Sequence, residues 1–203
     1  MDLALTEWLE RPHLSAAEEF VVATHEAGHA VCALFCPHAP PIERISIAGD
    51  MAGSLGYVRH QDPAHRYVIT RGRLLDHMCV MMGGREAELL LLDDLSIGSA
   101  QDLAQATEIA RALVEEFGMG GEAVGLRSVR AGERDGKRPP LSPAQLESID
   151  KRVRELLEEA RQRAAQILAD NRGVVEALRD LLVEQKTVEA RSLAAMVADK
   201  RTV

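Results

Sequence analysis

The residues best suited to chemistry form the sequence HEAGH at positions 25–29. Two histidines four residues apart on a helix project from one face about one turn apart, so both rings can bind one metal ion. Glu26 would lie beside that ion and could accept a proton from a coordinated water as the water attacks a carbonyl. Gly28 costs about 1 kcal/mol relative to alanine inside a helix, which indicates a functional or packing demand. The pattern is typical of zinc-dependent hydrolases.

A third ligand has to come from another part of the chain, because a catalytic zinc site uses three protein ligands and an open position for water. Asp102 is the candidate, since it falls in the first turn of a predicted helix, where the helix dipole favours an ionised carboxylate. Two alternatives stay open. HEAGH is short enough to arise by chance on a polar or partly buried helix face, and Asp102 has the spacing of a capping-box partner of Ser99.

Hydrophobic spacing and capping signals predict that helices position these residues. The HEAGH helix opens with a capping box at residues 15–18 and ends before Pro37. Gly83 and Gly84 lie inside a second predicted helix, where a glycine pair either kinks the helix or lets another backbone approach closely. The further helices are predicted at residues 74–92, 99–117, 142–171, 174–184 and 188–199.

Two short runs, at residues 44–48 and 55–60, have strand-like composition and are joined by a glycine-containing turn, which predicts a small hairpin. An exposed edge of either strand could align an extended peptide through backbone pairing. The remaining histidines lack ligand spacing and are expected on the surface, with His60 the one that could approach the cleft. These five are His13, His38, His60, His65 and His77.

Composition bounds the class of protein. The chain has 203 residues, 46% hydrophobic and 28% charged, which indicates one folded domain rather than a disordered chain. With a net charge of -8 and no blocks of consecutive Lys/Arg, the sequence predicts no basic surface for binding nucleic acid or anionic lipid. The three cysteines form no CxxC pair and predict buried thiols in a reducing compartment. An acidic N-terminus and no apolar stretch of about 18 residues predict a cytoplasmic protein.

Four blocks taken together resemble the peptidase domain of the FtsH family of ATP-dependent zinc proteases. They are HEAGHA, LGYV, GGREAE and SIGSAQDLAQATEIARALVEEFGM, in the family's order and at similar spacing. The similarity continues from about residue 15 to 198. By this resemblance His25, His29 and Asp102 are the ligands of Zn²⁺, and Glu26 is the catalytic glutamate. Glu88 matches an acidic position where a carboxylate could orient a ligand histidine, although a solvated helix carboxylate fits the spacing equally well.

The resemblance implies a mainly α fold with a small β element. We expect an N-terminal extension at residues 1–14 and a single peptidase domain at 15–200, with a catalytic part at 15–118, a mobile loop at 119–141 and a helical part at 142–200. The expected activity is that of a zinc metalloendopeptidase acting on unfolded or loosely folded polypeptides. Ile97 departs from the family, which usually has threonine there, and this affects loop packing more than metal chemistry.

A larger departure concerns energy coupling. FtsH proteins ordinarily carry a membrane segment and an ATPase module before the peptidase, whereas this sequence contains no GxxxxGK[ST] phosphate loop. We therefore expect a peptidase without its own ATPase, acting unaided or supplied by a separate AAA ATPase partner that could also tether it to a membrane. The resemblance also implies a six-membered ring of identical chains. The alternative function is an inactive zinc-binding, ring-forming interaction module.

Overall fold

A computed structural model describes residues 14–48, 55–61, 67–122, 124–129 and 141–193. The helices within these ranges are α2 (Ala16–Phe35), α3 (Arg71–Leu92), α4 (Ala100–Glu115), α5 (Pro143–Asp170) and α6 (Arg172–Gln185), with a short 3-10 helix η1 (Ile97–Ser99) before α4. The strands are β1 (Ile42–Ser46), β2 (Tyr57–His60) and β3 (Thr187–Glu189). The predicted fold class, mainly α with a small β element, is confirmed.

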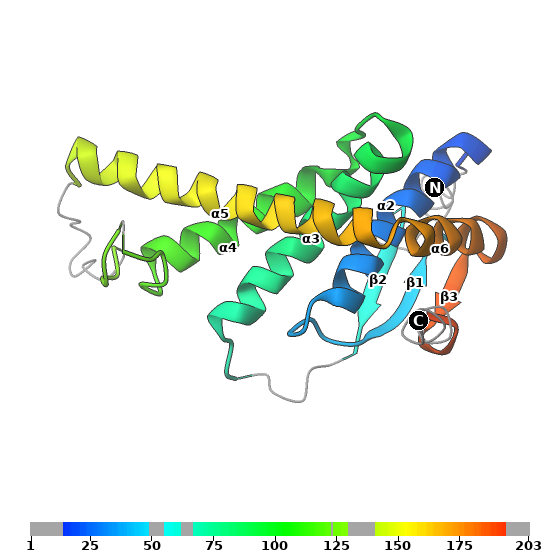
Figure 1. The fold of residues 1–203 in the computed structure, drawn as a ribbon, viewed down its shortest axis with the longest axis horizontal. Coiled ribbons are helices and arrows are strands. Elements are labelled where there is room, and N and C mark those ends of the chain that lie inside the picture. The colour runs from blue at the N-terminus through cyan, green and yellow to red at the C-terminus, as the bar shows by residue number, and fades with distance from the viewer. Residues whose placement is uncertain (1–13, 49–54, 62–66, 123, 130–140, 194–203) are drawn as a thin grey trace, which may run out of the picture.

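The helix that carries HEAGH lies at the centre of the packing. Helix α2 contacts α3, α6 and β1, while α3 also packs against α4 and α5. Helix α5 runs along the long axis of the molecule, beside α4 at one end and across α3 further along, and the sheet lies at the other end (Figure 1). Eleven consecutive residues of α2, from Ala23 to Ala33, are buried. The two histidines are therefore held by packing on several sides.

Local signals define the helix starts. Ser15 and Glu18 form the predicted capping box of α2. Helix α3 begins three residues earlier than predicted, because the Thr70 side chain accepts a hydrogen bond from the backbone of the first turn. Helix α5 opens with a proline after a second capping box, close to the predicted bounds. None of the described helices combines the length and the apolarity needed to cross a lipid bilayer.

The two predicted strands pair antiparallel, with Ile45 opposite Val58. Their bounds shift by about two residues from the predicted runs, and the turn that joins them, at 49–54, lies outside the described residues. The order of strands in the sheet is β2-β1-β3, so β1 is paired on both sides. Among the described residues, β2 is paired on one side only. Of the two predicted strands, β2 therefore has a free edge and β1 has none, while β3 forms the other edge of the sheet.

The third strand contradicts the prediction of a helix from residue 188. Lys186 adopts a left-handed conformation, with φ of 63°, which ends α6 and turns the chain into the sheet. Val188 then pairs opposite Ile45 and is almost fully buried. Helix begins only at residue 190, and residues 194–203 lie outside the described part. The pairing partner is more than 140 residues away, so local periodicity could not reveal it.

The described part of the predicted loop, residues 119–122 and 124–129, contains neither helix nor strand. The remainder of that loop and most of the predicted N-terminal extension lie outside the described residues.

Helices α2 and α3 meet backbone to backbone at Gly28 and Gly83. A Cβ added to Gly28 would lie 2.2 Å from the Gly83 carbonyl oxygen, and one added to Gly83 would lie 2.6 Å from the Gly28 carbonyl oxygen. Real Cβ contacts are essentially never this short. Of the two explanations for the glycine pair in α3, the structure therefore favours close approach by another backbone for Gly83.

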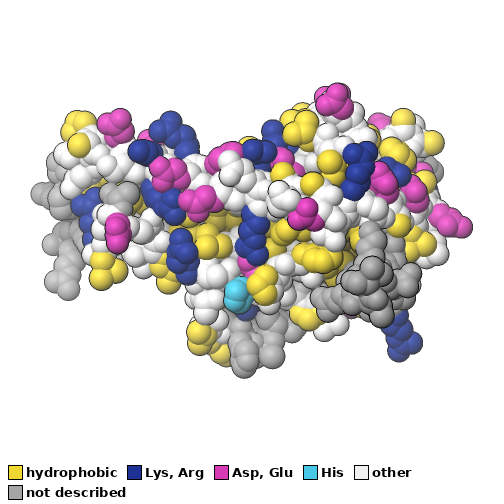
Figure 2. Space-filling view, in the orientation of Figure 1, with side chains coloured by type: hydrophobic (Ala, Val, Ile, Leu, Met, Phe, Trp, Pro, Cys, Tyr) yellow, Lys and Arg dark blue, Asp and Glu magenta, His cyan; other side chains and the backbone are white. Residues whose placement is uncertain are grey.

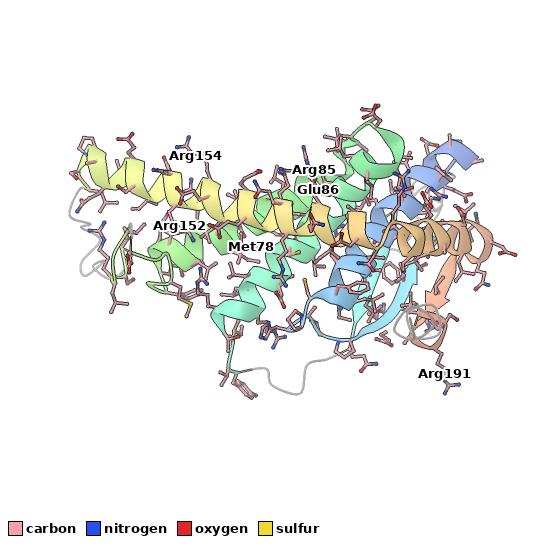
Figure 3. All side chains as sticks on the ribbon, in the orientation of Figure 1. Met78, Arg85, Glu86, Arg152, Arg154 and Arg191 are labelled. Atoms are coloured by element: carbon pink, nitrogen blue, oxygen red, sulfur yellow. The ribbon has the colours of Figure 1, made fainter. Side chains whose placement is uncertain are left out.

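Two buried carboxylates of α3 join this helix to α5. Asp76 accepts hydrogen bonds from Arg163 at 2.5 Å and from the backbone N–H of His38 at 2.7 Å. Glu86 pairs with the neighbouring Arg85 and accepts a hydrogen bond from Arg161 at 3.0 Å. Figure 3 shows Arg85 and Glu86 of α3 beside α5. Both carboxylates are almost fully buried, so each needs its charged partner to offset the cost of desolvation.

The outer face of α5 is charged and internally paired. Arg152 contacts Glu155 and Glu159, and Arg161 contacts Glu158. Basic and acidic side chains are interspersed over this helix on the face shown in Figure 2. Its opposite face contributes the apolar core residues Ile149, Val153, Leu156, Ala160, Ala164 and Leu168. Helix α5 therefore covers the core with one face and meets solvent with the other.

We predict that Gly83→Ala lowers the free energy of unfolding by about 2–3 kcal/mol, because the added methyl group meets rigid backbone rather than a movable side chain. Gly72→Ala on the same helix is the matched control. Its Cβ would lie 3.2 Å from the end of the His38 ring, which can move, and alanine favours the helix. Urea unfolding of both variants tests this, and equal stability would contradict the proposed backbone contact.

Asp76 should also make stability depend on pH. Burial opposes its ionisation, but the hydrogen bonds from His38 and Arg163 outweigh burial and hold the pKa of Asp76 below its usual value. A carboxylate whose pKa is lower in the folded state stabilises the fold above its unfolded pKa, near 4, and this contribution is lost as pH falls through the folded value.

We therefore expect Asp76→Asn to cost about 3 kcal/mol at pH 7, because it leaves Arg163 without its buried charge partner. The difference from the wild type should shrink at pH 3. Asp150→Asn, at an exposed carboxylate that pairs with Arg111 at 3.8 Å, should cost less than about 1 kcal/mol at either pH. Urea unfolding at the two pH values measures this, and a difference for Asp76→Asn that does not change with pH would contradict it.

Candidate metal centre

His25 and His29 lie one turn apart on buried α2, and their Nε2 atoms are 3.0 Å apart. The other nitrogen of each ring is already engaged. His29 Nδ1 donates to the Val80 carbonyl oxygen at 2.7 Å, and His25 Nδ1 donates to the Glu88 carboxylate at 2.6 Å. A carbonyl can only accept, so the hydrogen of a neutral His29 is on Nδ1. In the neutral rings both Nε2 atoms are therefore lone-pair donors that face each other.

Asp102 completes the cluster from α4. Its Oδ2 lies 3.4 Å from Nε2 of His25 and 3.4 Å from Nε2 of His29. The alternative, a capping box with Ser99, is not observed: Ser99 makes no side-chain cap hydrogen bond. Ser96 instead caps η1 by accepting a hydrogen bond from the backbone of Gly98. The short 3-10 helix thus separates the capping serine from α4 and leaves Asp102 directed at the histidines.

Three acceptor atoms that face one another repel unless a cation lies between them. One nitrogen from each histidine and one oxygen from Asp102 all lie within 4.8 Å of one another. This set of two imidazoles and one carboxylate fits a zinc ion with a position left for water. Among the His, Cys, Asp and Glu side chains of the described residues, these three form the group whose ligand atoms lie close enough together to hold one metal ion.

The protonation of the cluster reflects its charge. Burial disfavours a charged His25, but hydrogen bonds to Asp102 and Glu88 outweigh burial and raise the pKa of His25 to about 9. Burial also opposes ionisation of Asp102, yet the two histidines lower its pKa well below the usual value. The cluster therefore favours a positive charge, which either a proton or a metal ion can supply.

Glu26 lies beside the cluster and is 7% exposed. Burial raises its pKa, the two histidines lower it and Asp102 raises it again, with a net increase. A carboxylate whose pKa is raised takes up a proton more readily than an exposed one, which suits a general base.

Glu88 connects the metal cluster to the loop before α4. It is 1% exposed, so the alternative of a solvated helix carboxylate is wrong. Besides His25, it accepts hydrogen bonds from the Ser96 backbone N–H at 2.6 Å and from the Ser96 hydroxyl at 2.9 Å. Glu88 thereby orients one candidate ligand and anchors the segment that leads to another, Asp102.

Gly84 provides the space in which the His25 ring lies. A Cβ at Gly84 would be 2.4–2.6 Å from three atoms of that ring. The two glycines of α3 therefore have different structural roles: Gly83 contacts the backbone of α2, and Gly84 contacts a candidate metal ligand. Sequence reasoning identified the pair but not this division, and it missed Ser96 and the Val80 carbonyl, because these contacts depend on how α3 lies against α2.

A cleft of about 1000 Å³ opens onto the cluster. His25, Glu26, His29 and Asp102 line it, together with β2 and part of α3. The histidines expected on the surface, His38, His60 and His77, also line this cleft, whereas His13 and His65 lie outside the described residues. His60 donates to the Pro40 carbonyl at 3.0 Å, and burial lowers its pKa, so its ring is neutral at pH 7.

Comparison with known proteins identifies the family of this chain. The sequence profile of peptidase family M41 matches residues 12–196. The chain belongs to peptidase family M41. The resemblance noted from the four sequence blocks is thereby confirmed.

Relatives of this M41 chain include proteins named ATP-dependent zinc metalloprotease FtsH. The protein from Pseudomonas putida is 39% identical over 191 residues, a match that covers 90% of this chain and 31% of that protein. The protein from Burkholderia pseudomallei is 34% identical over 197 residues, covering 93% of this chain and 29% of that protein. The chain thus spans about a third of the length of these relatives.

We predict that Glu88→Gln weakens zinc binding by the M41 chain about 10- to 100-fold, because a neutral amide orients His25 less strongly than a carboxylate does. Glu108→Gln, which neutralises an exposed carboxylate of α4, is the matched control and should leave affinity unchanged. Competition with a zinc-binding dye measures both. Unchanged affinity in Glu88→Gln would contradict the orienting role.

Proposed function

We propose that this chain is a zinc-dependent metalloendopeptidase with His25, His29 and Asp102 as the metal ligands and Glu26 as the general base. The observation that carries the proposal is the convergence of three lone-pair donors, two of which have fixed tautomers, within 4.8 Å of one another. A buried carboxylate adjacent to that point and a cleft that leads to it support hydrolysis rather than a purely structural metal site.

The chemistry divides among the residues as follows. A zinc ion bound there would acidify a coordinated water and polarise the scissile carbonyl. Glu26 removes the proton of the attacking water and returns it to the leaving amine. As metal ligands, His25 and His29 would be held in place by their contacts with Glu88 and Val80, so little reorganisation would accompany the reaction.

The free edge of β2 supports an extended polypeptide as the substrate. Gly56, Tyr57 and Val58 line the cleft, and the backbone of an edge strand can pair with a peptide of almost any sequence. Because such pairing needs an extended chain, the substrates are unfolded or loosely folded polypeptides. Of the two strand edges considered from the sequence, β1 is excluded by its pairing on both sides.

The remaining parts of the proposal concern partners and location. We infer that an AAA ATPase delivers the polypeptide and that the chains assemble into a ring of identical subunits. The relatives named as ATP-dependent zinc metalloproteases support the first inference. The three cysteines are free and buried, which suits the reducing cytoplasm.

Glu26→Gln tests the proposed chemistry. The variant should keep its bound zinc, because Glu26 is not a ligand, yet degrade an unfolded protein at least about 100-fold more slowly than the wild type. Bound zinc is measured by elemental analysis, and degradation is followed with and without an added AAA ATPase. Removing zinc from the wild type with a chelator should abolish cleavage, and adding zinc back should restore it.

Two outcomes would overturn this function. If both proteins bind zinc and neither degrades the unfolded protein under either condition, the chain is the inactive interaction module. If His25→Ala retains full zinc content, the metal lies elsewhere.

A further inference from the structure

The segment that precedes the substrate-binding edge contacts the proposed base directly. Gly56 comes immediately before β2, and a Cβ placed on it would lie 2.7 Å from Oε1, 2.8 Å from Cγ and 3.0 Å from Cδ of Glu26. All three atoms belong to one side chain, that of the buried carboxylate beside the metal cluster. The Gly56 backbone therefore forms one wall of the space that the Glu26 side chain occupies.

The need for glycine here is spatial rather than conformational. Among the described residues, the glycines with positive φ are Gly118, Gly121 and Gly125, and Gly56 is not one of them. An alanine at position 56 could thus adopt the same backbone conformation. What excludes alanine is the Glu26 side chain.

The consequence of filling this space differs from that at the α2–α3 contact. At Gly28 and Gly83 an added methyl group meets backbone, so the helices themselves must move. At Gly56 it meets a single side chain, which can change its torsion angles without any movement of a helix. The Glu26 carboxylate would have to retreat by about 0.7 Å to reach the 3.4 Å at which ordinary van der Waals contact begins.

We propose that Gly56 is a positioning residue for the base: its missing side chain fixes Glu26 between the metal ligands and the free edge of β2. The strand that pairs with the peptide and the carboxylate that activates the water are then placed relative to each other, because the residue immediately before the strand also confines the carboxylate. This inference rests on the proposed peptidase function and deepens it.

Gly56→Ala tests the proposal. We expect unchanged zinc content and melting temperature, because neither a ligand nor a packed backbone is displaced. We expect kcat to fall about 100-fold while KM changes little, because a misplacement of about 1 Å in a catalytic group has an effect of that size. Gly72→Ala, which adds a methyl group near the movable end of His38, is the control and should retain full kcat.

A second variant separates a positioning role from a structural one. Glu26→Gln removes the base, so in this background no catalytic carboxylate remains for a methyl group at position 56 to displace. Adding Gly56→Ala to Glu26→Gln should therefore reduce kcat less than about fivefold further, against about 100-fold in the wild type. A crystal structure of the Gly56→Ala protein supplies a readout independent of activity and should show the Glu26 carboxylate displaced.

Three results would overturn the inference: full kcat in Gly56→Ala, an equal loss in the Glu26→Gln background, or an unmoved Glu26 in the crystal. Loss of zinc or a lower melting temperature would likewise assign Gly56 to the fold. An inactive wild type would refute the proposed function, and the crystal structure would still decide whether Gly56 confines Glu26.

Discussion

The contact of α2 and α3 at Gly28 and Gly83 is the constraint on which the rest of the site depends. Only backbones that touch bring the two helices close enough for α3 to reach the histidines of α2. Val80 then accepts from His29, Gly84 makes room for the His25 ring, and Glu88 accepts from His25. A side chain at the crossing would separate the helices and remove all of these contacts together.

Helix α3 also contributes three buried carboxylates to the core. Its three most buried carboxylates face three different parts of the molecule: Asp76 meets His38 and α5, Glu86 meets α5, and Glu88 meets α2 and the loop before α4. Each buried charge is compensated by a specific partner, as the cost of desolvating an isolated carboxylate requires. Because α3 carries buried charges that face several neighbouring elements, its buried residues do not form a single apolar stripe.

The glycines of this region differ in what surrounds them, and this decides what each contributes. Gly28 and Gly83 meet backbone and set the distance between helices. Gly84 meets an imidazole, and Gly56 meets a carboxylate. The close packing of backbone against functional side chains leaves the histidines and Glu26 few positions to adopt. Such preorganisation is what an electrostatic mechanism requires, because groups already in place need not reorganise during reaction.

The sequence by itself determined the local features. The spacing of His25 and His29, the capping boxes of α2 and α5, the antiparallel strand pair and the mainly helical class all follow from short-range patterns, because they involve residues within a few turns of one another. The four blocks shared with FtsH proteases also singled out Asp102 and Glu88, yet the residues alone left capping and solvation as alternatives for them. Tertiary structure excluded capping by Ser99 for Asp102 and solvation for Glu88, since burial and hydrogen-bond partners depend on elements more than 60 residues away. The strand at Thr187–Glu189, the role of Ser96 and the different tasks of Gly83 and Gly84 were likewise decided only by tertiary structure, because each arises where segments distant in sequence come into contact.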